Sequence, residues 1–198
     1  MNKILYTIGY SNRSLVDFIA ILKKNHINAL CDVRSQPFSK FNSQYNKQPL
    51  KDALKTNGIT YVFLGEELGA RPKDSNCYID NQAKYELIAK TELFQIGIKR
   101  IIEAFKKGYR PALMCAEKDP LVCHRTILVC RNLRSIGIRI IHIIDDNRNE
   151  TNEEMENRML KELDIHPSLF EGSNPHATLE RAYDIQGEKI AYVSKPKI

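Results

Sequence analysis

Short apolar runs alternate with helix-periodic segments along the first 144 residues, and this alternation constrains the fold more than any other feature. The predicted strands are residues 3–8, 29–33, 59–64, 111–115 and 139–144. The segments between them, residues 14–22, 50–57, 94–107 and 123–135, carry apolar residues at the spacing of amphipathic helices. Strands that alternate with helices favour a parallel sheet with right-handed crossovers. We therefore predict an α/β fold with a mainly parallel sheet of about five strands flanked by helices.

The last quarter of the chain has a different character. Residues 145–156 are dense in Asp, Asn, Glu and Arg, which predicts a solvated connector leading into a short helix up to Leu163. Residues 182–193 resemble two short strands joined at Gln186-Gly187. We predict a core domain over residues 1–146 and a C-terminal extension, residues 147–198, packed on that core.

Composition limits the partners and the cell compartment. The chain has 198 residues and a net charge of +6. Such a basic balance favours an acidic partner, and DNA or a nucleotide is the first choice. No run of about 18 apolar residues is present, so we expect no membrane contact. Five cysteines, three of them inside apolar runs, suit a reducing compartment, and we expect a cytoplasmic protein. The sequence leaves the oligomeric state open.

Chemically capable residues are concentrated in residues 112–125. A predicted strand ends at Cys115, Pro120 prevents its continuation, and Cys123 opens a predicted helix. Loops between the carboxyl end of a strand and the start of a helix are where open α/β sheets bind ligands. The free amide groups of the helix start also favour anions. This loop is therefore the predicted site.

Four sequence motifs carry a family resemblance. Residues 7–14, 31–37, 113–118 and 123–125 resemble the family catalogued as domain of unknown function 488, and the similarity runs from about residue 4 to residue 143. The resemblance implies an association with DNA base excision. The family often has His where this chain has Tyr10, so a role for that imidazole does not carry over.

Four residues are the catalytic candidates: Asp32, Cys115, Glu117 and His124. Asp32 ends one predicted strand and Glu117 follows another, so a doubly wound sheet could bring the two carboxylates into one cleft. Cleavage of a base–sugar N-glycosidic bond develops positive charge on the sugar, which a carboxylate pair stabilises. His124 would recognise the base or donate a proton. The alternative role for Asp32 is a structural ion pair with Arg34. The alternative for Glu117 is a carboxylate exposed to solvent in the loop.

Eight residues are the candidates for substrate binding. Cationic side chains would hold phosphates, and aromatic and amide side chains would contact a base. The candidates are Ser11, Asn12, Arg13, Arg34, Lys40, Asn42, Tyr45 and Arg125. Their alternative roles are structural, such as an Arg125 paired with a neighbouring carboxylate or aromatic residues packed beneath an exposed loop.

The leading hypothesis is a DNA glycosylase-like hydrolase that needs no metal or cofactor. A rhodanese-like sulfurtransferase with Cys115 as nucleophile is the first alternative, although the loop after Cys115 contains two acids and no glycine. A non-catalytic nucleic-acid-binding module is the second. Zinc bound by Cys115, Cys123 and His124, with Cys77 or Asp119 as fourth ligand, is a further possibility that the spacing does not favour.

Overall fold

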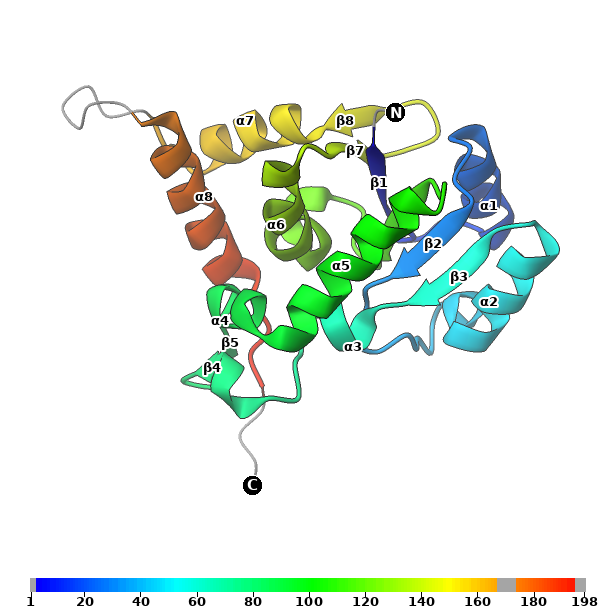
Figure 1. Cartoon of the computed structure of the whole chain (residues 1–198), viewed down its shortest axis with the longest axis horizontal. Helices are drawn as coiled ribbons and strands as arrows, with labels where there is room; N and C mark the ends of the chain where they lie inside the picture. Colours follow the sequence, from blue (N-terminus) through cyan, green and yellow to red (C-terminus); the bar gives the residue numbers. More distant parts are fainter. Residues whose placement is uncertain (1–2, 167–173, 195–198) are drawn as a thin grey trace.

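A six-stranded, mostly parallel sheet forms the centre of the molecule (Figure 1). The computed structural model describes residues 3–166 and 174–194. The sheet runs in the order β3-β2-β6-β1-β7-β8. Its strands are β1 (Ile4–Gly9), β2 (Ala29–Asp32), β3 (Thr60–Phe63), β6 (Pro111–Cys115), β7 (Arg139–Ile143) and β8 (Asn149–Thr151). Only β8 is antiparallel to its neighbour. The predicted α/β fold is confirmed, and β8 is the strand that the sequence pattern did not indicate.

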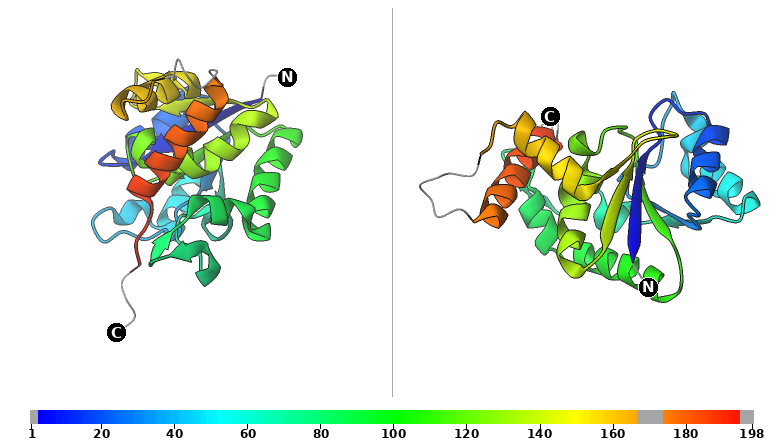
Figure 2. Two further views of the ribbon diagram at one scale, coloured as in Figure 1. Left: turned by 90° about the vertical axis from the view of Figure 1, so that its left-hand side faces the viewer. Right: turned by 90° about the horizontal axis from the view of Figure 1, so that it is seen from above.

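Helices cover both faces of this sheet (Figure 2). On one face lie α1 (Leu15–Lys24) and α2 (Lys47–Thr56), whose buried leucines and Phe18 join one apolar cluster. On the other face lies α5 (Glu92–Lys106), whose Phe94, Ile98 and Ile101 join a second cluster. Ser14 is the N-cap of α1, as the sequence pattern indicates, because its side chain accepts a hydrogen bond from the amide of Asp17 in the first turn of the helix.

The predicted helix over residues 123–135 is divided into three pieces. It consists of a π-helical turn (Arg125–Cys130), α6 (Arg131–Leu133) and a 3-10 turn (Arg134–Ile136) that ends at Gly137, where φ is +72°. Every residue of the π-helical turn is buried. Such turns occur frequently at functional sites.

Small elements occupy residues 65–90. They are α3 (Gly65–Leu68), a 3-10 turn (Ser75–Cys77), the hairpin strands β4 (Tyr78–Ile79) and β5 (Gln82–Ala83), and α4 (Tyr85–Lys90). A further 3-10 turn (Ser43–Tyr45) lies in the loop after β2. None of the helices in the described part of the chain has the length and apolar character needed to cross a membrane.

The C-terminal segment is helical, and two predictions made for it are wrong. The connector expected over residues 145–156 is wrong because it contains β8 and the start of α7 (Asn152–Glu162), which Thr151 and Glu154 begin with a capping box, but the short helix expected up to Leu163 is present as α7. The two strands expected around Gln186-Gly187 are part of α8 (Pro175–Ile190). Gly187 marks close packing rather than a turn, because a Cβ there would lie 3.3 Å from the ring of Tyr85. Residues 167–173 and 195–198 of the predicted extension lie outside the described residues.

The strand order places a topological switch point between β1 and β6. The chain leaves β1 through α1 and crosses to β2, whereas it leaves β6 through the π-helical turn and crosses over β1 to β7. Because neighbouring strands send their connections to opposite faces, a crevice forms at their carboxyl ends. Gly9 and Cys115 are paired in register at this edge.

A buried histidine in β7 predicts a pH dependence of stability. His142 is fully buried, and its Nδ1 lies 2.8 Å from Thr7 Oγ1. Burial, followed by the charge of Arg125, lowers the pKa of His142 to about 3. In the unfolded chain the ordinary pKa of about 6.5 applies, so below that pH the unfolded state binds a proton that the folded state does not. Stability therefore falls as the pH drops through 6.5 toward 3.

We expect this histidine to cost about 1–2 kcal/mol of unfolding free energy between pH 7 and pH 5. The check is urea unfolding at both pH values for wild type and His142→Gln. The variant should show a smaller loss over this interval, whatever its stability at pH 7. Equal losses in the two proteins would rule out the proposed titration of His142.

Candidate functional site

A pocket of about 420 Å³ opens at the switch point. Cys115, Glu117 and His124 line one part of it and supply the groups with acid, base and nucleophile chemistry. Arg34 and Arg71 line it as well, and the aromatic walls are Tyr10, Phe38, Tyr85 and Tyr192. The pocket thus combines reactive groups, cations and aromatic rings.

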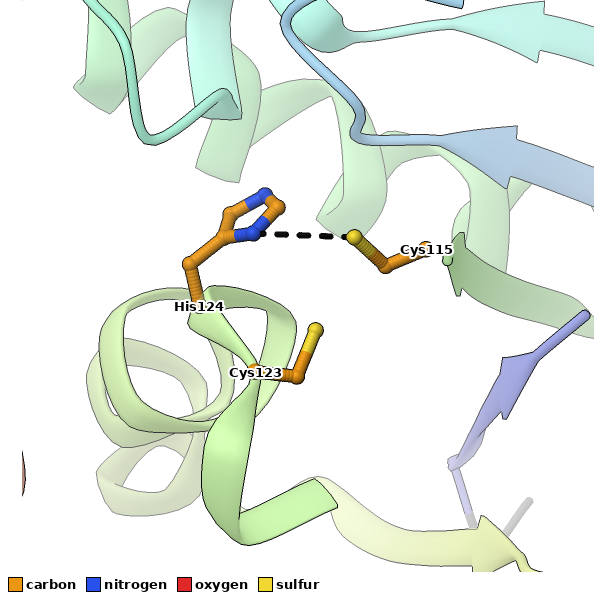
Figure 3. A group of neighbouring side chains, drawn as sticks. All are labelled: Cys115, Cys123 and His124. Atoms are coloured by element: carbon orange, nitrogen blue, oxygen red, sulfur yellow. Dashed lines mark hydrogen bonds between the residues drawn. The ribbon is translucent and has the colours of Figure 1, made fainter. Parts of the chain in front are cut away.

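Three side chains beside the pocket point toward one another (Figure 3). One potential ligand atom each from Cys115, Cys123 and His124 lies within 4.8 Å of the other two. His124 Nδ1 lies 3.6 Å from Cys115 Sγ, while its Nε2 lies 2.9 Å from the carbonyl oxygen of Val33. A carbonyl oxygen only accepts, so Nε2 carries a proton and Nδ1 faces the sulfur.

Glu117 completes this group of reactive side chains. Its Oε2 lies 3.0 Å from Cys123 Sγ, a contact that needs one proton between the thiol and the carboxyl. Partial desolvation, and then the negative charge of Cys123, raise the pKa of Glu117. Burial by itself would raise the pKa of Cys123, but the hydrogen bond from Cys115 and the charge of Arg125 outweigh it and lower that pKa. The same contact raises the pKa of Cys115.

The loop that carries Glu117 is held against the start of the chain. The amides of Tyr10 and Ser11 donate to the carbonyl oxygens of Cys115 and Ala116, at 3.1 and 2.9 Å. Arg125, which is fully buried, donates through Nη1 to the carbonyl oxygen of Glu117 at 2.6 Å and through Nη2 to that of Lys118 at 3.1 Å. Arg125 therefore shapes the loop from beneath instead of facing the pocket as a phosphate clamp.

Asp32 is occupied by an ion pair. Both of its carboxylate oxygens accept hydrogen bonds from the guanidinium of Arg34, at 2.9 and 2.6 Å, and the hydroxyl of Tyr61 donates to it at 2.8 Å. Asp32 is fully buried, and it is not among the residues that line the pocket. The structure thus places Asp32 in the structural ion pair that the sequence offered as an alternative and not in a carboxylate pair with Glu117.

The same ion pair leaves one donor of Arg34 free. Its Nε and Nη2 donate hydrogen bonds to Asp32, and Nη2 also donates to the carbonyl oxygen of Tyr45 at 2.8 Å. Its Nη1 is buried and has no hydrogen-bond partner among the described residues. A buried donor without a partner is costly. Because Arg34 lines the pocket, a ligand oxygen would relieve that cost.

Six of the other predicted binding residues lie outside the pocket lining. Arg13 is held at the carboxyl end of β7, where it donates to the carbonyl oxygen of Ile144 and pairs with Asp146. Tyr45 is fully buried and stacks on Tyr10, with their ring centroids 4.3 Å apart, so its ring offers no face to a base. The remaining four, Ser11, Asn12, Lys40 and Asn42, lie in loops at the surface.

Tyr85 and Tyr192 are among the pocket residues that the predicted site did not include. Tyr85 comes from the start of α4, and Tyr192 follows α8, where the guanidinium of Arg71 lies 4.4 Å from its ring centroid. No motif marks Tyr85, whereas Tyr192 belongs to a tail, residues 181–192, that resembles the family. The ring of Tyr85 packs against α8 at Gly187, and Tyr192 directly follows that helix.

A second hollow of about 590 Å³ lies near Lys118 and Arg158. Arg158, one of the cations that line it, already pairs with Asp119 and Glu150 at 2.8 and 2.9 Å. No cysteine or histidine lines this hollow. We therefore assign the chemistry to the pocket at the switch point.

The fold and the pocket together place this protein in the class of α/β domains that carry a pocket at the carboxyl ends of their parallel strands. The chain belongs to the family described as "Domain of unknown function DUF488", whose model matches residues 14–131. This confirms the family resemblance drawn from the motifs. No curated protein matches the chain, and no solved structure does so either.

Proposed function

We propose that this protein is a hydrolase that acts on DNA or a nucleotide and cleaves the N-glycosidic bond between a base and its sugar. One observation carries the proposal. The pocket brings the carboxyl of Glu117 together with aromatic walls and the unpartnered Nη1 of Arg34.

The aromatic walls suit a planar base. Phe38 is 66% exposed, while Tyr10 is held in place by the stacked ring of Tyr45 and by the guanidinium of Arg34, which lies 5.2 Å from its ring centroid. Bases stack on such side chains without sequence preference. A pocket of about 420 Å³ lies within the usual size range of small-ligand sites.

The cations suit a phosphate. Arg34 Nη1 needs an acceptor, and Arg71 makes no ion pair with an acid among the described residues. Guanidinium groups bind phosphate oxygens through charge-assisted hydrogen bonds. A nucleotide supplies both the planar base and the anionic oxygens that the pocket lacks.

Glu117 would act on the bond that breaks. Hydrolysis breaks the bond between the sugar carbon and the base nitrogen, joins that carbon to the oxygen of a water molecule, and moves one proton from the water to the departing base. Positive charge develops on the sugar during the step, and a nearby carboxylate stabilises it. Because Asp32 is held by Arg34, Glu117 performs this role without a second carboxylate.

An exposed loop beside the pocket suits DNA. Phe38 lines the pocket and Phe41 is 97% exposed, with Lys40 between them. An enzyme that acts on a base in a duplex must turn that base out of the stack, and apolar side chains can wedge into the space that the base leaves. The exposed phenylalanines and the lysine fit such a docking surface.

The test is excision from labelled duplexes that carry uracil, 5-hydroxymethyluracil or other altered bases, followed by alkali to cut abasic sites. We expect wild type to produce cuts and Glu117→Gln to be slower by about 10²–10⁴-fold. Glu103→Gln, on the exposed surface of α5, is the matched control and should keep the wild-type rate.

Other outcomes would contradict the proposal. Salt-sensitive DNA binding without any cut would favour a binding module. Sulfur transfer from thiosulfate to cyanide that is lost in Cys115→Ser and kept in Glu117→Gln, with no base excision, would favour a sulfurtransferase.

A further inference from the structure

We infer that Cys115, Cys123 and His124 bind one zinc ion and leave an open coordination position on the side of the pocket. The three ligand atoms lie within 4.8 Å of one another, although seven residues separate the two cysteines in the sequence. The inference goes beyond the proposed function and holds for any reaction that the pocket catalyses.

The spacing of the ligand atoms fits a tetrahedral ion. Zinc binds a thiolate sulfur at about 2.3 Å and an imidazole nitrogen at about 2.0–2.1 Å. Two such ligands at a tetrahedral angle lie about 3.6 Å apart. Cys115 Sγ and His124 Nδ1 are 3.6 Å apart, a separation that also suits two ligands of one ion.

The imidazole is already oriented as a ligand. Metal-bound histidines usually donate their other ring N–H to a carboxylate or a backbone carbonyl. His124 Nε2 lies 2.9 Å from the carbonyl oxygen of Val33, directly after β2, so the proton of the neutral ring stays on Nε2 and Nδ1 presents its lone pair to the ion. Figure 3 shows this nitrogen turned toward the sulfur of Cys115.

The surrounding charge favours thiolates. Arg125 is fully buried, and its guanidinium donates to the carbonyl oxygens of Glu117 and Lys118 in the loop between the two cysteines, so its positive charge lies beside the cluster. On binding, the proton of the Cys115 thiol and the proton shared between Cys123 and Glu117 are both released to solvent, the metal–sulfur and metal–nitrogen bonds form, and nothing is oxidised. Two thiolates balance the charge of the divalent ion.

The fourth position is open to the pocket. No other His, Cys, Asp or Glu joins the cluster within the part of the chain that the structure describes. Asp119 is held by Arg158, and Cys77 is not part of the cluster, so neither is the fourth ligand. Three protein ligands with one open position are typical of catalytic zinc sites.

Glu117 is in place to serve a metal-bound water. Cys115, Glu117 and His124 all line the pocket, and Glu117 Oε2 lies 3.0 Å from the sulfur of Cys123. Zinc lowers the pKa of a bound water to about 7, and a neighbouring glutamate can take up the proton. The site would thus supply a hydroxide for hydrolysis in the pocket.

The test is metal content and metal affinity of the full chain. We expect about one zinc per chain by elemental mass spectrometry after exposure to zinc and removal of the excess. Cobalt in its place should give a thiolate-to-metal absorption band and visible bands of tetrahedral intensity. Cys123→Ser and His124→Gln should weaken zinc binding at least about 100-fold. Cys130→Ser, a buried cysteine outside the cluster, is the matched control and should bind like wild type.

Circular dichroism shows which variants fold, and the cobalt spectrum of wild type tests the ligand set without any variant. A wild-type chain that binds no zinc, or variants that bind it as tightly as wild type, would overturn the inference. A chain isolated with Cys115 and Cys123 joined in a disulfide that excludes zinc would also overturn it. Zinc binding without base excision would refute the proposed function alone. Excision by wild type together with failure to bind zinc would refute the metal site alone.

Discussion

Replacement of Asp32 by Asn is expected to lower the free energy of unfolding by about 3–5 kcal/mol. Asp32 is fully buried, and its carboxylate accepts two hydrogen bonds from Arg34 and one from Tyr61. The substitution removes the negative charge but leaves the guanidinium, which is only 6% exposed, without its counterion. Urea unfolding at pH 7 measures the effect.

Two comparisons separate the ion pair from other causes. Asp52→Asn, at an exposed position of α2, should change stability by less than about 0.5 kcal/mol. The double variant Asp32→Asn with Arg34→Met should be more stable than Asp32→Asn alone, because no charge is then left buried. An Asp32→Asn chain as stable as wild type would show that the ion pair contributes nothing to folding.

Replacement of Gly9 by Ala is expected to displace the loop that carries Glu117. A Cβ at this position would lie 1.8 Å from the carbonyl oxygen of Glu117, and a backbone atom cannot rotate away as a flexible side chain can. We expect a loss of about 3 kcal/mol of stability, together with loss of zinc binding and of base excision. Urea unfolding and the two functional assays measure these effects.

Gly58→Ala is the matched control for this variant. Gly58 has a φ of +73° and no atom within 4 Å of an added Cβ, so alanine there costs about 1–2 kcal/mol of backbone strain without any collision. It should keep zinc binding and excision. A Gly9→Ala chain that retains both functions would show that the loop has room to adjust.

Local patterns predicted the five parallel strands of the sheet and placed three of the candidate site residues in one segment. Cys115, Glu117 and His124 lie within ten residues of one another, and a strand end, a proline and a helix start bring them together by chain geometry alone. Motif spacing also predicted the family. These features depend on interactions between residues close together in the sequence, so local sequence patterns are sufficient to predict them.

Contacts between distant segments could not be predicted in the same way. The sequence did not tell whether Arg125 would face the pocket or the sheet, and its position beneath Glu117 depends on how the π-helical turn packs against β1. The places of Tyr85 and Tyr192 depend on the path of α8, whose Gln186-Gly187 pair resembles a turn. Seven residues separate Cys115 from Cys123, a spacing that did not favour a metal site in the sequence. In the fold, the loop between them turns back, so that their sulfur atoms lie within 4.8 Å of each other.

The most direct test of the proposed function is mass spectrometry of the small molecules that the protein releases from DNA containing altered bases. Wild type and Glu117→Gln would be incubated with the same substrates, and free bases would be separated and identified by mass. We predict that wild type releases one free base and leaves an abasic sugar, and that Glu117→Gln releases almost none. Release of no base by wild type, or equal release by both proteins, would contradict base excision by Glu117.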